Sequence, residues 1–264
     1  MISTKGSDFC AGGVGAGAAV SSERDYLSRS ASFDWRVSSD DRNRTYALGL
    51  GVASDRINSV NGVAVNQKRD TVDVLIGVTQ VLSAEAIVQS NIGYSTGHGY
   101  YSDPYKTIDF RPDHREVFAW LTRYNQHLSQ FDATLNLSYR YTYDSFGTNS
   151  HTVDARWLQS LPGGWTVAPS LRYYTQSAAD FYFDPPFPQG FDLGKPYSAD
   201  TRLSAFGAFT PGISATKTLP DDWTLDVDFE FYRQRSGWRV GGAGSPGIEP
   251  LSARWVSLGL TKAF

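Results

Sequence analysis

Apolar and polar side chains alternate along much of this chain with a period of two residues. Between Phe131 and Asp144, one set of alternate positions is apolar or aromatic, as at Leu137 and Tyr143, and the other set is polar or charged. The same alternation returns over 223–231. A β-strand sends successive side chains to opposite faces, whereas a helix would group them every three or four residues. The chain is therefore predicted to consist of β-strands with one apolar and one polar face.

The repeated pattern predicts about twelve antiparallel strands. They form one all-β domain over 11–264, after a frayed or disordered segment at 1–10. The predicted strands span 11–21, 25–38, 43–56, 68–81, 85–101, 114–128, 131–145, 150–161, 165–180, 200–218, 223–238 and 251–264.

The predicted connections differ in length at the two ends of the strands. Short turns are expected at 39–42, 82–84, 129–130, 162–164 and 219–222. Most of the others are longer, at 56–67, 102–113, 181–199 and 239–250. Short turns on one side and long loops on the other are typical of bacterial outer-membrane barrels. The fold class predicted is an up-and-down transmembrane β-barrel with short periplasmic turns and long extracellular loops.

The aromatic content supports a lipid bilayer as the partner of this barrel. Aromatic residues make up 14% of the chain, and Trp and Tyr favour the boundary between membrane and water. An inner and an outer aromatic girdle are predicted from Trp165, Trp223, Tyr141, Tyr143, Tyr173 and Tyr232. A soluble β-sandwich or lipocalin-like barrel would show the same alternation, but it would not explain the unequal loops or the aromatics at strand ends.

An even number of strands places both termini at the periplasmic end. The last strand carries Val256, Leu258 and Leu260 on one face and ends on Phe264. A terminal aromatic on such a strand resembles the signal that the bacterial barrel-assembly machinery reads, so that machinery is an expected partner during biogenesis. The first residues lack the basic and apolar regions of a signal peptide, so either such a signal has been removed or the chain is a fragment.

Charge and motifs exclude several other functions. The net charge is −3, which gives no basic field for nucleic acid. Cys10 is the one cysteine, so no internal disulfide framework is possible. No EF-hand spacing or Cys/His ligand set occurs, and neither a cofactor nor a metal is expected. Loop aspartates such as Asp103, Asp109 and Asp200 are more often turn formers than cation ligands.

Charged side chains of both signs fall on the strand faces predicted to line the lumen. They are Asp34, Asp73, Arg123, Asp132, Arg140, Asp154, Arg156, Arg172, Arg202, Asp226, Asp228 and Glu230. Such charges are tolerated when they are paired or hydrated. They therefore either brace the barrel as a polar network or line a narrow selective conduit. Asp226, Asp228 and Glu230 form the one run of a single sign, which the arginines would neutralise.

An enzyme is not expected, although one arrangement keeps a hydrolase open as a weaker alternative. His98, His114 and His151 fall near the ends of the predicted long-loop side, where a serine-histidine site in a barrel would lie. No nucleophile-elbow motif accompanies them.

Several short segments resemble a family of bacterial proteins known as DUF3570, a domain of unknown function. The segments are AGAAVSSERDYLS (16–28), GYSTGHGYYSDPYK (93–106), RYNQH (123–127), WTVAPSLRYYTQSAADFY (165–182), YSADTRLSAFGA (197–208) and GGAGSPGIEPLSARW (241–255). The resemblance implies an outer-membrane-type β-barrel of unassigned role and supplies no catalytic residues. Members of that family usually carry further β-structure before this region, so the native barrel could hold more strands.

The function predicted from these observations is a porin-like outer-membrane barrel that serves as a passive conduit for a small solute. The alternative is a closed structural or binding barrel that engages a partner through its loops.

Overall fold

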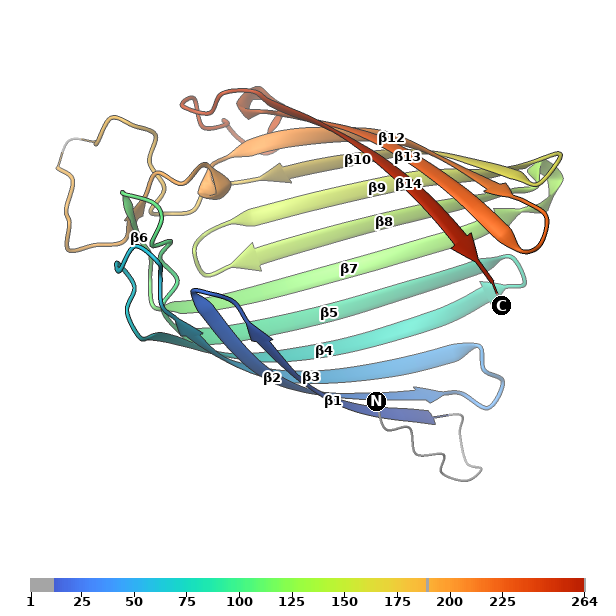
Figure 1. Ribbon diagram of the computed structural model, residues 1–264, viewed down its shortest axis with the longest axis horizontal. Coiled ribbons are helices and arrows are strands. Elements are labelled where there is room, and N and C mark those ends of the chain that lie inside the picture. Colours follow the sequence, from blue (N-terminus) through green and yellow to red (C-terminus); the bar gives the residue numbers. More distant parts are fainter. Residues whose placement is uncertain (1–11, 189, 264) are drawn as a thin grey trace.

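Twelve long strands form one antiparallel sheet in the computed structural model of the protein, which describes residues 12–188 and 190–263 (Figure 1). The strands are β1 (Gly12–Ser22), β2 (Tyr26–Ser38), β3 (Arg44–Ile57), β4 (Gln67–Ser83), β5 (Ala86–Gly99), β7 (His114–Leu128), β8 (Ala133–Asp144), β9 (Asn149–Leu161), β10 (Trp165–Gln176), β12 (Phe206–Thr218), β13 (Trp223–Arg235) and β14 (Leu251–Lys262). Each pairs with its neighbours in chain order. The prediction of an all-β fold with twelve antiparallel strands is confirmed.

Short secondary-structure elements occupy the connections. Two two-residue strands, β6 (Asp109–Phe110) and β11 (Tyr197–Ser198), pair with each other outside the main sheet. The single-turn 3-10 helices are η1 (Ser129–Phe131), η2 (Thr201–Leu203) and η3 (Ser236–Trp238). None of the described helices has the length and apolar character needed to cross a membrane.

All the long connections lie at one end of the sheet, together with the short connections 23–25 and 145–148. The turns after β2, β4, β7, β9 and β12 are short and share one end, where β1 begins and β14 ends (Figure 1). In the turn between β9 and β10, Gly163 and Gly164 have φ of 79° and 74°. Successive left-handed residues are what a tight hairpin with the natural strand twist requires, and glycine adopts them without strain.

One strand begins later than the alternation predicts. The strand expected at 200–218 starts at Phe206. The side chain of Asp200 accepts a hydrogen bond from the backbone N–H of Arg202, which caps the η2 turn. Residues 200–205 therefore belong to a loop.

The sheet curls like a barrel, but its two edges are not joined. Within residues 12–188 and 190–263, β1 pairs with β2 alone and β14 pairs with β13 alone. The closed sheet that the sequence predicts is therefore not formed between these strands. Alternation reports which face of a strand is apolar and carries no information on which strands meet edge to edge, so closure could not be derived from it.

The register sorts the side chains into an apolar outer face and a polar inner face. One outward row runs through Trp35, Leu48, Ile76 and Ile92 on successive strands, and Ile76 is 62% exposed. The opposite face carries charges, and there Arg156 on β9 reaches Ser214 on β12, beyond the neighbouring strand. A curved sheet brings side chains of non-adjacent strands together on its concave side. The contact between Arg156 and Ser214 therefore identifies the charged face as the inner one. Large apolar side chains turned outward are typical of a barrel that lies in lipid.

Candidate functional site

A charged patch lies on the inner face where β9, β10, β12 and β13 run side by side. The register aligns Asp154 with Arg172 on the neighbouring strand, and Arg172 Nε donates to Asp154 Oδ1 at 2.5 Å. Ser138 Oγ donates to the other oxygen of Asp154 at 3.1 Å. Arg156 Nη2 donates to Ser214 Oγ at 3.0 Å. These contacts hold the two guanidinium groups along one stretch of the wall.

Two carboxylates on β13 face the same space as these arginines. Asp228 and Glu230 line a hollow of about 520 Å³ together with Arg156 and Arg172. Its other lining residues are Ser170, Ser214, Trp255 and Ser257. Among the described residues, neither Asp228 nor Glu230 forms an ion pair, whereas Asp226 on the same strand accepts a hydrogen bond from Thr216 at 2.7 Å. The wall therefore offers both signs of charge to a polar solute.

The other predicted lumen charges on β2 to β8 face inward but are more dispersed. Asp34 lies against β1, where a Cβ added at Gly15 would sit 2.3 Å from Asp34 Oδ1, so a larger residue at this position would require the Asp34 side chain to move. Arg123 Nη1 lies 3.5 Å from Gln89 Oε1. Asp73 and Arg140 form no ion pair with any residue that the structure describes. The structure therefore does not join the predicted charges into a single network.

Three sequence predictions need correction. Asp132 lies in the turn after η1, with φ of 47°, and does not line the lumen wall. Arg202 lies in the η2 turn at the long-loop end, where it pairs with loop carboxylates. Tyr232 is on the inner face of β13, opposite the girdle side, and packs near Phe206 and Ile248. The errors at Asp132 and Arg202 have one cause, which is that the predicted strands extended too far into the connections.

The remaining predicted girdle residues lie on the outer face at the two ends of the sheet. At the short-turn end, Lys217 Nζ lies 5.1 Å from the ring centre of Trp165 and Lys262 Nζ lies 5.3 Å from that of Trp223. Toward the long loops, Tyr141 donates to Asn149 at 2.8 Å and Tyr173 to the carbonyl of Trp238 at 2.6 Å. Tyr143 is also outward and 46% exposed.

Three of the four predicted assembly-signal residues lie among the residues that the structure describes. Val256, Leu258 and Leu260 lie on the outer face of β14, with exposed fractions of 68%, 74% and 61%. Phe264 and the predicted frayed segment at 1–10 lie outside the described residues.

The loop segments 100–113 and 197–205 form a compact structure at the long-loop end of the sheet, which we call the cap. The two-residue alternation does not extend into these loops. Arg111 Nε lies 2.9 Å from Asp109 Oδ2, and Arg111 Nη2 lies 2.9 Å from Asp200 Oδ2. Arg202 pairs with the same Asp200 and, at 2.5 Å, with Asp103. The Asp109 and Asp200 side chains are almost fully buried. Burial tends to raise the pKa of Asp200, but hydrogen bonds and charge from Arg202 and Arg111 outweigh it and hold that pKa below its ordinary value.

An apolar cluster anchors the cap to the strands. Phe146 is 1% exposed and packs with Ala179 and Leu203, and the rings of Tyr101 and Phe181 contact its own ring edge-on. The guanidinium of Arg115 on β7 lies 4.8 Å from the centre of the Phe146 ring. The loops are thus fixed over the inner face.

The buried ion pairs of the cap were not predicted, because the loop aspartates were interpreted as turn formers and not as partners of arginines. A signal was present in the two Asp-x-Arg triplets, Asp109 to Arg111 and Asp200 to Arg202. Asp109 and Arg111 make contact because residues two apart in extended chain point to the same side. Asp200 instead contacts Arg202 across the η2 turn that it caps.

The histidines do not meet a serine among the described residues. His98 and His114 stack on the outer face with ring centres 4.1 Å apart, and His114 Nε2 lies 3.4 Å from Glu116. His151 lies 2.8 Å from the hydroxyl of Tyr139. In the described part of the chain, no group of three or more His, Cys, Asp and Glu side chains is arranged to hold a metal ion.

Known structures share this fold at low sequence identity. CdiB from Acinetobacter baumannii matches with a TM-score of 0.50 and 16% identity, over 88% of this chain and 44% of that one. A mutant of the ferric enterobactin receptor PfeA from Pseudomonas aeruginosa matches with a TM-score of 0.54 and 11% identity, over 95% of this chain and 41% of that one. This chain spans less than half the length of either protein. The fold is that of outer-membrane β-barrels.

Sequence comparison identifies the family. No curated protein matches this chain in sequence. Residues 60–255, most of the chain, match the family described as "Protein of unknown function (DUF3570)". The expected resemblance is confirmed, and the chain belongs to the DUF3570 family.

Proposed function

We propose that this protein is an outer-membrane barrel that acts as a passive conduit for small polar solutes. The observation that carries the proposal is the inner wall around Arg156, Arg172, Asp228 and Glu230, which lines a hollow of about 520 Å³ with both signs of charge. A wall that only braced the barrel would pair its charges, and Asp228 and Glu230 have no ion-pair partner among the described residues. The apolar outer face supports a membrane location.

Ion selectivity in planar bilayers tests the proposal. A unit charge about 6 Å from the path is worth roughly 0.7 kcal/mol in water, which is about threefold in local ion concentration. The double variant D228N/E230Q should therefore reduce the preference for cations by about threefold or more. The double variant R156Q/R172Q should increase the preference for cations, because it removes two positive charges from the wall and leaves Asp154 without its arginine.

A matched control separates charge in the wall from total charge. Glu249 is exposed in the loop before β14, so E249Q should leave selectivity unchanged. Conducting channels with the same selectivity in all variants would contradict the role of this wall, and a protein that stays soluble without detergent would contradict the membrane location.

A second candidate is a binding barrel that engages a partner through the cap. The observation in its favour is an aromatic cluster in the loop between β10 and β11. The rings of Phe183, Phe187 and Phe191 contact one another, and Phe191 contacts Tyr197. Phe187 is 50% exposed, and exposed aromatics on a fixed loop are common in recognition surfaces. Absence of conductance from a correctly inserted protein would favour this candidate.

A further inference from the structure

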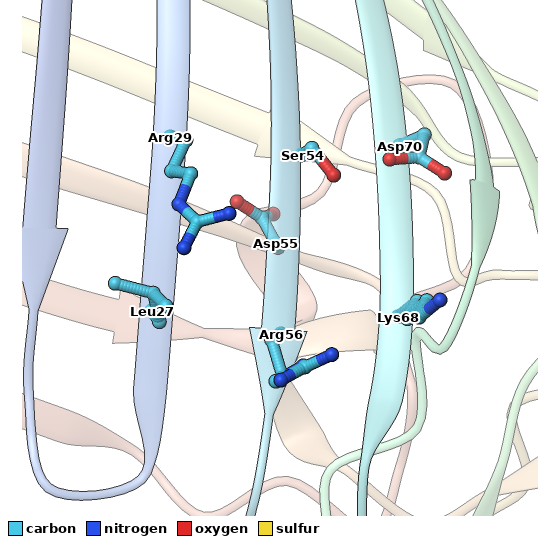
Figure 2. Close-up of a pocket in the computed structure, with 7 residues that line it drawn as sticks. All are labelled: Leu27, Arg29, Ser54, Asp55, Arg56, Lys68 and Asp70. Carbon is cyan, nitrogen blue, oxygen red and sulfur yellow. The ribbon is translucent and has the colours of Figure 1, made fainter.

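A basic patch lies on the outer face of β2, β3 and β4, close to their long-loop ends. The register places Leu27, Arg56 and Lys68 in one cross-strand row, and Arg29, Ser54 and Asp70 in the next row. Figure 2 shows Arg29, Arg56 and Lys68 on three neighbouring strands. We refer to Arg29, Arg56 and Lys68 as the basic rim.

The basic rim is not explained by contacts within the protein. Arg56 and Lys68 stand directly opposite each other, and like charges in that position are destabilising. In the part of the chain that the structure describes, no ion pair or side-chain hydrogen bond involves Arg29, Arg56 or Lys68. An anion held between them would remove their mutual repulsion.

The nearby carboxylates do not neutralise the rim. Asp55 belongs to the inner face and is 5% exposed, and its Oδ2 accepts from Arg69 at 2.8 Å. Asp70 is the one outward carboxylate in the two rows. Three cations therefore face one carboxylate, which leaves an excess of positive charge on the outer surface.

Two adjoining hollows lie on the surface around the basic rim, and the second extends toward the apolar side chains of the outer face. A hollow of about 270 Å³ is lined by Arg29, Arg56, Lys68 and Asp70, with Leu27, Ser54 and Asp55. A second, of about 440 Å³, shares Arg29, Ser54 and Asp70 and extends along Ala31, Val52 and Val72. Since a water molecule takes about 30 Å³ of liquid, the first hollow has room for a phosphate group with bound water. The apolar side chains of the second hollow would not contribute to the binding of a free anion.

We propose that the basic rim binds the phosphorylated headgroup of an outer-leaflet lipid, with an acyl chain lying along Val52 and Val72. Arginine and lysine form charge-assisted hydrogen bonds to phosphate oxygens. The long-loop end is the outer-leaflet end if the barrel has the sidedness predicted from its loops. The proposal rests on the proposed function only in requiring that the outer face lie in a membrane.

Lipid retention in nanodiscs tests the proposal. The purified protein is inserted into nanodiscs of zwitterionic phospholipid with diphosphorylated lipid A, and the lipid A that remains bound is counted by native mass spectrometry. The double variant R56Q/K68Q removes two charge-assisted hydrogen bonds to phosphate, so it should retain at least about tenfold less lipid A. The exchange variant R56K/K68R keeps both charges and should retain most of it.

Controls separate this site from general charge and from free phosphate. K217Q removes an outward cation at the opposite end of the sheet and should not change retention. Dephosphorylated lipid A should bind at least tenfold less than the phosphorylated form, and millimolar inorganic phosphate should compete weakly.

Three results would overturn the proposal. They are equal retention by wild type and R56Q/K68Q, equal retention of dephosphorylated lipid A, and full competition by inorganic phosphate, which would indicate a site for a soluble anion. If the protein inserts and conducts while retention is unchanged, the lipid site alone fails. If the protein does not enter a bilayer, the membrane function fails with it.

Discussion

The substitution Asp200→Asn tests whether buried ion pairs hold the cap over the inner face. The Asp200 side chain is 1% exposed, and Oδ2 accepts from both Arg111 and Arg202. Arg111 is also largely buried, whereas the Arg202 side chain is 63% exposed. The loss of one partner from a buried ion pair costs about 3–5 kcal/mol. We use the lower end of that range because water screens Arg202.

The expected effect is local, because the cap contributes no strand to the main sheet. A loss of about 3 kcal/mol in the free energy of opening should speed amide hydrogen exchange in 100–113 and 197–205 by roughly a hundredfold. Exchange in β3 and β4 should not change. Hydrogen exchange with mass spectrometry measures both regions in one sample.

Asp192→Asn is the matched control. Asp192 lies in the same connection between β10 and β12, and its side chain accepts from the exposed backbone N–H of Gly194 at 2.8 Å. This variant should leave exchange in both cap segments at the wild-type rate. Equal protection in D200N and wild type would refute the reasoning, and so would a loss of protection spread evenly through the main sheet.

Two further predictions concern the cap. The pKa of Asp200 is lowered in the folded protein, so its contribution to stability is complete above the unfolded value of 3.8 and is lost as pH falls through the lower folded pKa. The protection of amides in 197–205, measured against the intrinsic exchange rate at the same pH, should therefore fall on acidification below pH 3.8, and D200N should lack that fall. Phe146→Ala removes a side chain that is 1% exposed and should lower the free energy of cap opening by about 3–5 kcal/mol, seen as faster proteolysis within 177–205, whereas the exposed Phe187→Ala should leave proteolysis unchanged.

The sheet could be predicted from the sequence because lipid and lumen impose opposite demands on the two faces of every strand. Val72, Val74, Ile76 and Val78 alternate with Thr71, Asp73, Gly77 and Thr79, and Leu75 is the one apolar residue on the opposite face of this stretch of β4. That contrast identified the strand and its apolar face, and the unequal loops and the aromatics at strand ends favoured a membrane barrel with that face outward. The edges carry no comparable signal, because edge pairing uses backbone groups that every residue has. The twelve strands therefore followed from the sequence, and the separation of β1 from β14 did not.

The inner wall was predicted in part, for a related reason. Asp228 and Glu230 were recognised as inward because they lie between Val227, Phe229 and Phe231 on one strand. Their position beside Arg156 and Arg172 depends on the register of four strands, and each register is fixed by the turn that joins two strands. A one-residue shift in any of those turns would place some of these four side chains on the outer face, so their common location required the structure.

The cap shows where a period of two residues stops being informative. β6 and β11 are two residues long, and alternation needs at least four residues to be recognised. Their pairing aligns Asp109 with Ser198, whose hydroxyl donates to the Asp109 carboxylate. Asp109, which this pairing holds in place, contacts Arg111, and Arg111 in turn contacts Asp200. The buried ion pairs of the cap therefore depend on the shortest strands of the fold.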